Sequence, residues 1–163
     1  MCISKIMADK EFNIENEYES LKKSHKLPDF KELNEEFELN SIEKKEFLIR
    51  NIRRRLNEKV IFFCRIIENL IYPSSQSPLS AYESNFFSDE KKQDLAKLHK
   101  KLMVFERQSM LLDTNPNSEG NAEYINKIHS EWDSFKKEIT ETVKEMKDSW
   151  HSELKDEEHV YFG

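Results

Sequence analysis

Hydrophobic residues recur every three or four positions along three long stretches of the chain. Residues at this spacing lie on one face of an α-helix, so each stretch predicts a helix that buries that face. The strongest stretch begins at Ser41, a suitable N-cap, and ends before Pro73, which predicts a helix over 41–72. Its apolar face comprises Ile49, Ile52, Leu56, Val60, Phe63, Ile67 and Leu70.

Two further long helices are predicted downstream. Ser88 can cap a helix over 88–113, whose first turn carries Asp89 and Glu90. The inner face of this helix comprises Leu95, Leu98, Leu102, Phe105, Ser109 and Leu112. A polar segment then separates it from a helix predicted over 121–154. The apolar face of that last helix comprises Ile125, Ile128, Trp132, Phe135, Ile139, Val143, Met146 and Trp150.

The first forty residues are acidic and predict one or two short helices. A thin apolar face predicts a helix over 9–26, which Pro28 ends. Asp29 can cap a second helix. The apolar residues of that second helix are Phe30, Leu33 and Phe37. Helices with so few large apolar residues are not stable alone, so we expect them either to pack on the long helices or to be mobile.

Together these elements predict an all-α fold. Three long helices would form an elongated antiparallel bundle, with the short N-terminal helices packed on it. We divide the chain into an acidic N-terminal helical segment (1–40), a helical bundle (41–154) and a flexible tail (155–163). The serine-rich segment 73–87 predicts a loop, and we expect its two consecutive phenylalanines to dock it on the bundle.

Composition narrows the functions that this fold can carry. The 163 residues include only two glycines, Gly120 and Gly163, whereas phosphate-binding loops, dinucleotide-binding turns and nucleophile elbows need several. A net charge of −6 disfavours a dedicated nucleic-acid-binding protein. Because no apolar run is long enough to span a membrane, we expect no membrane insertion. Cys2 and Cys64 form no metal-binding spacing, and a cytoplasmic location is the simplest expectation.

An arginine cluster is the sharpest local feature. Four of the six arginines lie close together in the first long helix, namely Arg50, Arg53, Arg54 and Arg55. Arginine forms bidentate contacts with phosphate and carboxylate groups, so the cluster predicts binding of a phosphate ligand, RNA or an acidic protein surface. In the alternative interpretation, which we favour, these arginines pair with acidic residues of neighbouring helices.

Apolar residues outside the three inner faces indicate a contact surface. The segment 60–71 is apolar nearly all round, so something must cover it. The predicted interface residues are Ile61, Phe62, Ile66, Met103, Val104, Met110 and Leu111. Their cover could be a partner protein or a second copy of the chain, and methionines suit such surfaces. Alternatively, the N-terminal helices cover them within one chain.

No residues form a recognisable catalytic or metal-binding set. None of the five histidines follows a glutamate by three positions, which is the pattern of di-iron bundles. We therefore expect no catalytic residue, no metal ligand and no cofactor. The first hypothesis is a non-enzymatic interaction protein, an adaptor or scaffold, with a protein partner or self-association as a homodimer. The alternatives are polyanion binding through the arginine cluster and a metal-dependent bundle with an unfamiliar carboxylate set.

Overall fold

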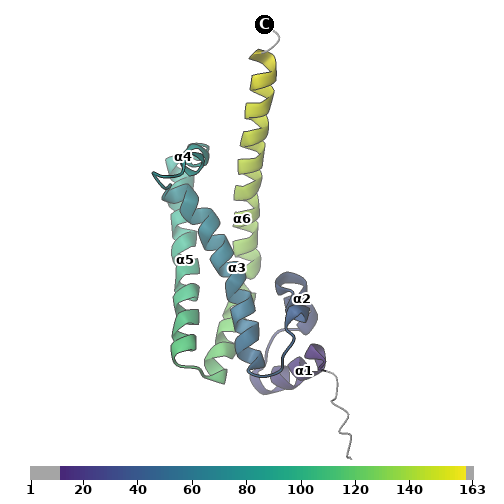
Figure 1. The fold of residues 1–163 in the computed structure, drawn as a ribbon. Coiled ribbons are helices and arrows are strands. Elements are labelled where there is room, and N and C mark those ends of the chain that lie inside the picture. Colours follow the sequence, from purple (N-terminus) through teal and green to yellow (C-terminus); the bar gives the residue numbers. More distant parts are fainter. Residues whose placement is uncertain (1–11, 161–163) are drawn as a thin grey trace, which may run out of the picture.

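The computed structural model describes residues 12–160, with side chains described as far as 155. Within this part of the chain all regular structure is helical, which confirms the predicted all-α fold (Figure 1). The helices are α1 (Ile14–His25), α2 (Phe30–Phe37), α3 (Leu48–Ile71), α4 (Pro78–Ser84), α5 (Asp89–Thr114) and α6 (Ser118–Val160), with a 3-10 turn at Leu39–Ser41.

The three long helices α3, α5 and α6 form the body of the molecule. They run alternately up and down in Figure 1, and α3 packs most extensively on α5 and next on α6. Every residue of the predicted inner faces of α3 and α5 is buried, including the polar Ser109. The hydrophobic pattern therefore identified the core of these two helices correctly.

Helix α6 is longer than its predicted range of 121–154. It begins at Ser118, and its backbone continues helical to Val160, into the segment expected to be a tail. Its inner face is buried as far as Ile139, but Val143 is 42 % exposed. The C-terminal end of α6 extends past its neighbours (Figure 1). The remaining tail residues 161–163 lie outside the described part of the chain.

The first long helix starts later than predicted. Helix α3 begins at Leu48 rather than at Ser41, so the expectation that Ser41 caps it is wrong. The Ser41 hydroxyl instead donates to the carbonyl of Glu38, 2.8 Å away, within the 3-10 turn. The residue before α3 is Phe47, whose φ of 55° is left-handed and cannot continue a helix. The charged residues 43–46 have no apolar face to hold a helix on the bundle.

The segment 73–87 is not a simple loop, because it contains α4. Ser77 caps this short helix by accepting a hydrogen bond from the Ser80 backbone N–H at 3.3 Å, and Pro78 occupies its first turn. The hydroxyl of Ser84 donates to the carbonyl of Leu70 at 2.7 Å, which ties α4 to the end of α3. The predicted docking is confirmed, since Phe87 is buried and Phe86 packs against the core.

The two N-terminal helices pack together, and α2 packs on the bundle through Phe37, whose ring centroid lies 4.7 Å from that of Trp132 on α6. Tyr18 of α1 is fully buried, its ring centroid lies 5.3 Å from that of Phe30, and its hydroxyl donates to the carbonyl of Pro28 at 2.8 Å. Helix α1 is shorter than the predicted 9–26, and residues 9–11 lie outside the described part. Asp29 precedes α2 but makes no side-chain capping bond, because its carboxylate pairs with Lys22.

The turn between α5 and α6 explains the glycine in the interior of the sequence. A Cβ atom on Gly120 would lie 2.6 Å from a methyl carbon of Leu112 and 2.8 Å from the amide oxygen of Asn117. The absence of a side chain at this position therefore lets Leu112 of α5 lie close to the first turn of α6. Among residues 12–160, no helix combines the length and apolar character that a membrane-spanning segment requires.

Candidate functional site

Arg53 lies in the core, where α3 meets α5 and α6. It is 0 % exposed, and its Nε donates to the amide oxygen of Asn121 at 3.0 Å. One terminal nitrogen donates to the carbonyl of Ser109 at 3.0 Å and to the hydroxyl of the same residue. The other pairs with the carboxylate of Asp113. A buried cation is tolerated only when it is paired and hydrogen-bonded, and these contacts meet that requirement.

The other three arginines are partly or largely exposed. Arg54 reaches the same Asp113 carboxylate from the surface, with its Nε 3.1 Å from Oδ1. Arg55 pairs with Glu58 at 2.6 Å and with Glu38 at 3.4 Å. Arg53 and Arg54 thus pair with an acid of the neighbouring helix α5, as in the interpretation that we favoured, whereas Arg55 pairs with Glu58 of its own helix and with Glu38, which follows α2.

The guanidinium of Arg50 lies over the ring of Phe47, 4.8 Å from its centroid, and forms no ion pair within residues 12–155. The structure therefore does not bring the four arginines together at one surface. Because Arg53 is enclosed, an external anion cannot reach it in this conformation. Anion binding by Arg50, Arg54 and Arg55 stays a prediction.

Asp113 has a lowered pKa in the folded protein. The main cause is the hydrogen bond from Arg53, and a second bond from Arg54 adds to it, whereas partial burial works in the opposite direction. A carboxyl group whose pKa falls on folding stabilises the folded state when it is ionised. The stabilisation is present above the ordinary pKa of 3.8 and is lost as the pH falls below that value toward the lowered pKa.

We therefore expect the substitution Asp113→Asn to have a pH-dependent effect. The variant should be less stable than the wild type at about pH 6, and the difference should begin to shrink as the pH falls below 3.8, where the unfolded chain takes up a proton that the folded carboxyl does not yet bind. Urea unfolding of both proteins at each pH measures the difference. A difference that stays constant across this range would show that the Asp113 charge does not stabilise the fold.

A shallow apolar groove lies along the outer side of α5, beside α6. Its volume is about 630 Å³, and it is lined by Met103, Val104, Arg107, Gln108, Leu111 and Lys127. Val104 is 66 % exposed and Leu111 is 68 % exposed. Three of the predicted interface residues thus line one groove, and none of the described segments covers it. The hydrophobic pattern did not identify the polar lining residues Arg107, Gln108 and Lys127. Lys127 reaches the groove only through the packing of α6 against α5.

The predicted interface residues on α3 belong to a different surface. Phe62 is 56 % exposed, whereas Ile61 and Ile66 are half-buried. Phe62 lies nine positions after Arg53, which is about two and a half helical turns, so the two side chains point in opposite directions. Since Arg53 faces α5, Phe62 faces away from it. The structure therefore divides the predicted interface between two faces of the bundle.

Met110 is also exposed, at 53 %, and does not line the groove. Its sulfur lies 3.2 Å from a terminal nitrogen of Arg107, which does line it. Met110 therefore lies at the edge of the groove surface rather than with the α3 residues.

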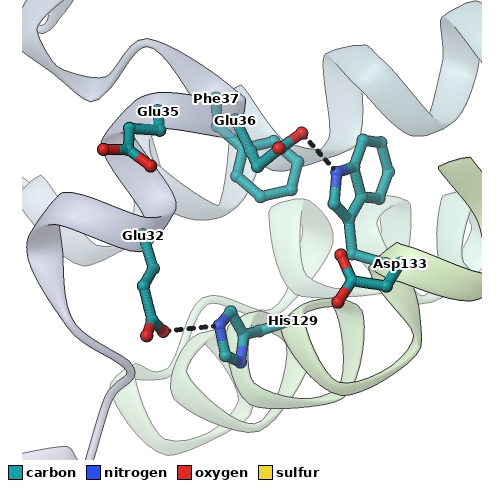
Figure 2. Close-up of a pocket in the computed structure, with 7 residues that line it drawn as sticks. Glu32, Glu35, Glu36, Phe37, His129 and Asp133 are labelled. Atoms are coloured by element: carbon teal, nitrogen blue, oxygen red, sulfur yellow. Dashed lines mark hydrogen bonds and ion pairs between the residues drawn. The ribbon is translucent and has the colours of Figure 1, made fainter.

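A second, polar pocket of about 330 Å³ lies between α2 and α6 (Figure 2). The Nε2 atom of His129 is 3.1 Å from a carboxylate oxygen of Glu32, and the indole N–H of Trp132 donates to Glu36 at 3.0 Å. Desolvation disfavours the charge on Glu36, but hydrogen bonds from Lys136 and Trp132 outweigh it and lower the pKa of Glu36. These contacts fasten α2 to α6. The polar side chains of this pocket are therefore explained by the packing of the two helices.

Within the described residues, no three histidine, cysteine or acidic side chains are grouped as ligands for a metal ion. Cys64 is buried, and burial raises the pKa of its thiol to about 11, so it is not an activated nucleophile. Comparison of the chain with protein-family models, curated proteins and solved structures found no match. The α5 groove, which the described chain leaves open, is therefore the candidate site.

Proposed function

We propose that this chain is a non-enzymatic interaction module, an adaptor or scaffold, that binds a partner protein through the α5 groove. The observation that carries the proposal is the exposure of Val104 and Leu111 in a groove that the described chain leaves open. Contiguous apolar surface of this kind commonly marks interaction sites. A helical partner suits a groove between two helices, because its side chains at one-turn spacing reach successive apolar positions. A cytoplasmic location suits such a module, since Cys64 is a free thiol.

The arginine cluster supports a binding function less well. Arg53 is enclosed, and Arg54 and Arg55 already have carboxylate partners. An anion would have to compete with these partners. The groove has no such competitor among the described residues, so it is the better candidate for contact with another molecule.

Binding of a model amphipathic peptide tests the proposal. The probe is a fluorescent helical peptide of roughly 18 residues, with leucines on one face and glutamines beside them, and its fluorescence anisotropy is followed as the protein is added. We expect saturable binding by the wild type. The substitution Leu111→Asp should reduce the affinity at least about tenfold, since it puts a charge into the apolar contact.

A matched substitution controls for the loss of an exposed leucine. Leu154 is 60 % exposed on α6 and does not line the groove, so Leu154→Asp should leave the affinity unchanged. Circular dichroism at the assay temperature should confirm that both variants are folded. Equal affinities for the wild type and the Leu111→Asp variant, or no binding by the wild type, would contradict the proposal.

A further inference from the structure

The groove is basic as well as apolar. Lys100, Val104, Arg107 and Leu111 follow one another at spacings of four, three and four residues, so they lie on one outward face of α5. Lys127 lines the groove from α6. The charged residues that line it are Arg107 and Lys127, and no acidic residue does so. The exposed face of α5 therefore alternates apolar and positively charged side chains.

These positive charges are largely free to meet a partner. Within the described part of the chain, Lys100 and Lys127 form no ion pair. The ion pair of Arg107 is with its sequence neighbour Glu106, at 3.4 Å and with 58 % of the Arg107 side chain exposed, and its guanidinium also donates to the sulfur of Met110 at 3.2 Å. A long, exposed ion pair of this kind contributes little stability and can exchange partners readily.

Other acids near the groove lie outside its lining. Glu123 and Glu131 lie one turn to either side of Lys127 on α6. Both are exposed, and neither lines the groove or bonds to Lys127. The charge that an approaching molecule would meet inside the groove is therefore positive.

The position of Arg107 argues against a second copy of this chain as the occupant. In a symmetric pair, each copy presents the same face to the other. Arg107 lies midway between Val104 and Leu111 on the exposed face of α5. A symmetric antiparallel contact through the two apolar residues would therefore place Arg107 next to Arg107 of the other copy. Like charges brought together in an interface cost free energy and suppress that pairing.

We propose that the groove selects an amphipathic helix whose apolar face is bordered by aspartate and glutamate. Its apolar side chains would pack on Val104 and Leu111. Its carboxylates would meet Arg107 and Lys127 at the groove and Lys100 one turn along α5. This inference rests on the proposed function and adds the chemistry of the partner. Because complementary charges chiefly provide specificity, the groove should discriminate between helices that share an apolar face but differ in flanking charge.

Two peptides with the same leucine face test the inference. One carries glutamates beside the leucines and the other carries lysines, and binding of each is measured by fluorescence anisotropy. At low salt the wild type should bind the glutamate peptide about tenfold more tightly than the lysine peptide. The difference should narrow as salt is added, because exposed charges are screened. The double variant Arg107→Glu with Lys127→Glu should reverse the preference.

A control variant separates the groove from the overall charge of the protein. Lys137 and Lys144 are exposed on α6, do not line the groove and have no ion-pair partner among the described residues. The double variant Lys137→Glu with Lys144→Glu changes the net charge by the same amount as the groove variant. It should keep the wild-type preference for the glutamate peptide.

The outcomes distinguish this inference from the function on which it rests. Equal binding of both peptides, or tighter binding of the lysine peptide, would overturn the acidic partner but leave a helix-binding groove. Failure of the wild type to bind either charged peptide or the glutamine-flanked one would overturn both proposals. Light scattering tests whether a second copy of the chain occupies the groove instead of a partner. If the wild type has twice the chain mass of 19.6 kDa and Leu111→Asp restores the single mass, a second copy fills the groove and the inference is wrong.

Discussion

Replacing Arg53 with alanine should lower the free energy of unfolding by about 3–5 kcal/mol. The side chain is fully buried, and its guanidinium is a hydrogen-bond donor to Ser109, Asn121 and Asp113. Without it, the amide oxygen of Asn121 and the backbone carbonyl of Ser109 lose a buried donor, and a cavity is left between α3, α5 and α6. Urea unfolding followed by circular dichroism measures the change.

Arg54 provides a matched control, because it binds the same carboxylate from outside. Its Nη2 lies 3.0 Å from an oxygen of Asp113, but its side chain is 50 % exposed. Exposed ion pairs contribute about 0–1 kcal/mol, so Arg54→Ala should cost no more than that. If both substitutions cost less than about 1 kcal/mol, Arg53 does not hold the three helices together, and its place in the predicted anion site should be reconsidered.

Replacing Trp132 with alanine should also cost about 3–5 kcal/mol of unfolding free energy. The Trp132 ring is stacked on that of Phe63, with centroids 4.9 Å apart and planes inclined by 5°, and its centroid lies 4.7 Å from that of Phe37. This residue is therefore where α2, α3 and α6 meet. Its removal deletes a large buried side chain and two aromatic contacts together.

The second tryptophan is the control for this substitution. Trp150 is half-buried, and its indole N–H donates to Glu83 at 2.9 Å near the projecting end of α6. Because it packs only near α4, Trp150→Ala should cost about 1–2 kcal/mol. Circular dichroism is the appropriate signal, since each substitution removes a fluorophore. A larger loss for Trp150 than for Trp132 would show that the aromatic cluster of α2, α3 and α6 is not a centre of stability.

The helices with regular hydrophobic spacing were predictable because that signal is local. A repeat every three or four residues identifies a helix and its inner face without reference to the rest of the chain. The boundaries of the helices were predicted less well than their inner faces. Ser41 is a capable cap, but residues 43–46 lack an apolar face, and α3 starts only where its hydrophobic stripe starts. Helix α4 was not predicted, although Ser77 followed by Pro78 is typical of the start of a helix. Its seven residues are too few to show a helical repeat of hydrophobic residues.

The contacts of the arginine cluster and of the groove depend on packing between distant segments. Arg53 bonds to Asp113 and Asn121, which are 60 and 68 residues away in the sequence. The one local signal was Ser109, a polar residue within the apolar face of α5. The exposed apolar side chains of α5 could be read from the sequence because they lie off its inner face. The contribution of Lys127 to the groove could not be predicted from the sequence, because it depends on how α6 lies against α5.

The most direct measurement is to map where an amphipathic helix docks on the folded protein. Backbone amide shifts of the isotopically labelled protein, recorded as the glutamate-flanked peptide is added, report which residues it contacts. The proposed groove predicts that the largest shifts occur at Val104, Leu111 and Lys127. Shifts concentrated around Phe62, or in the pocket between α2 and α6 that contains His129, would place the binding surface elsewhere and contradict the proposal.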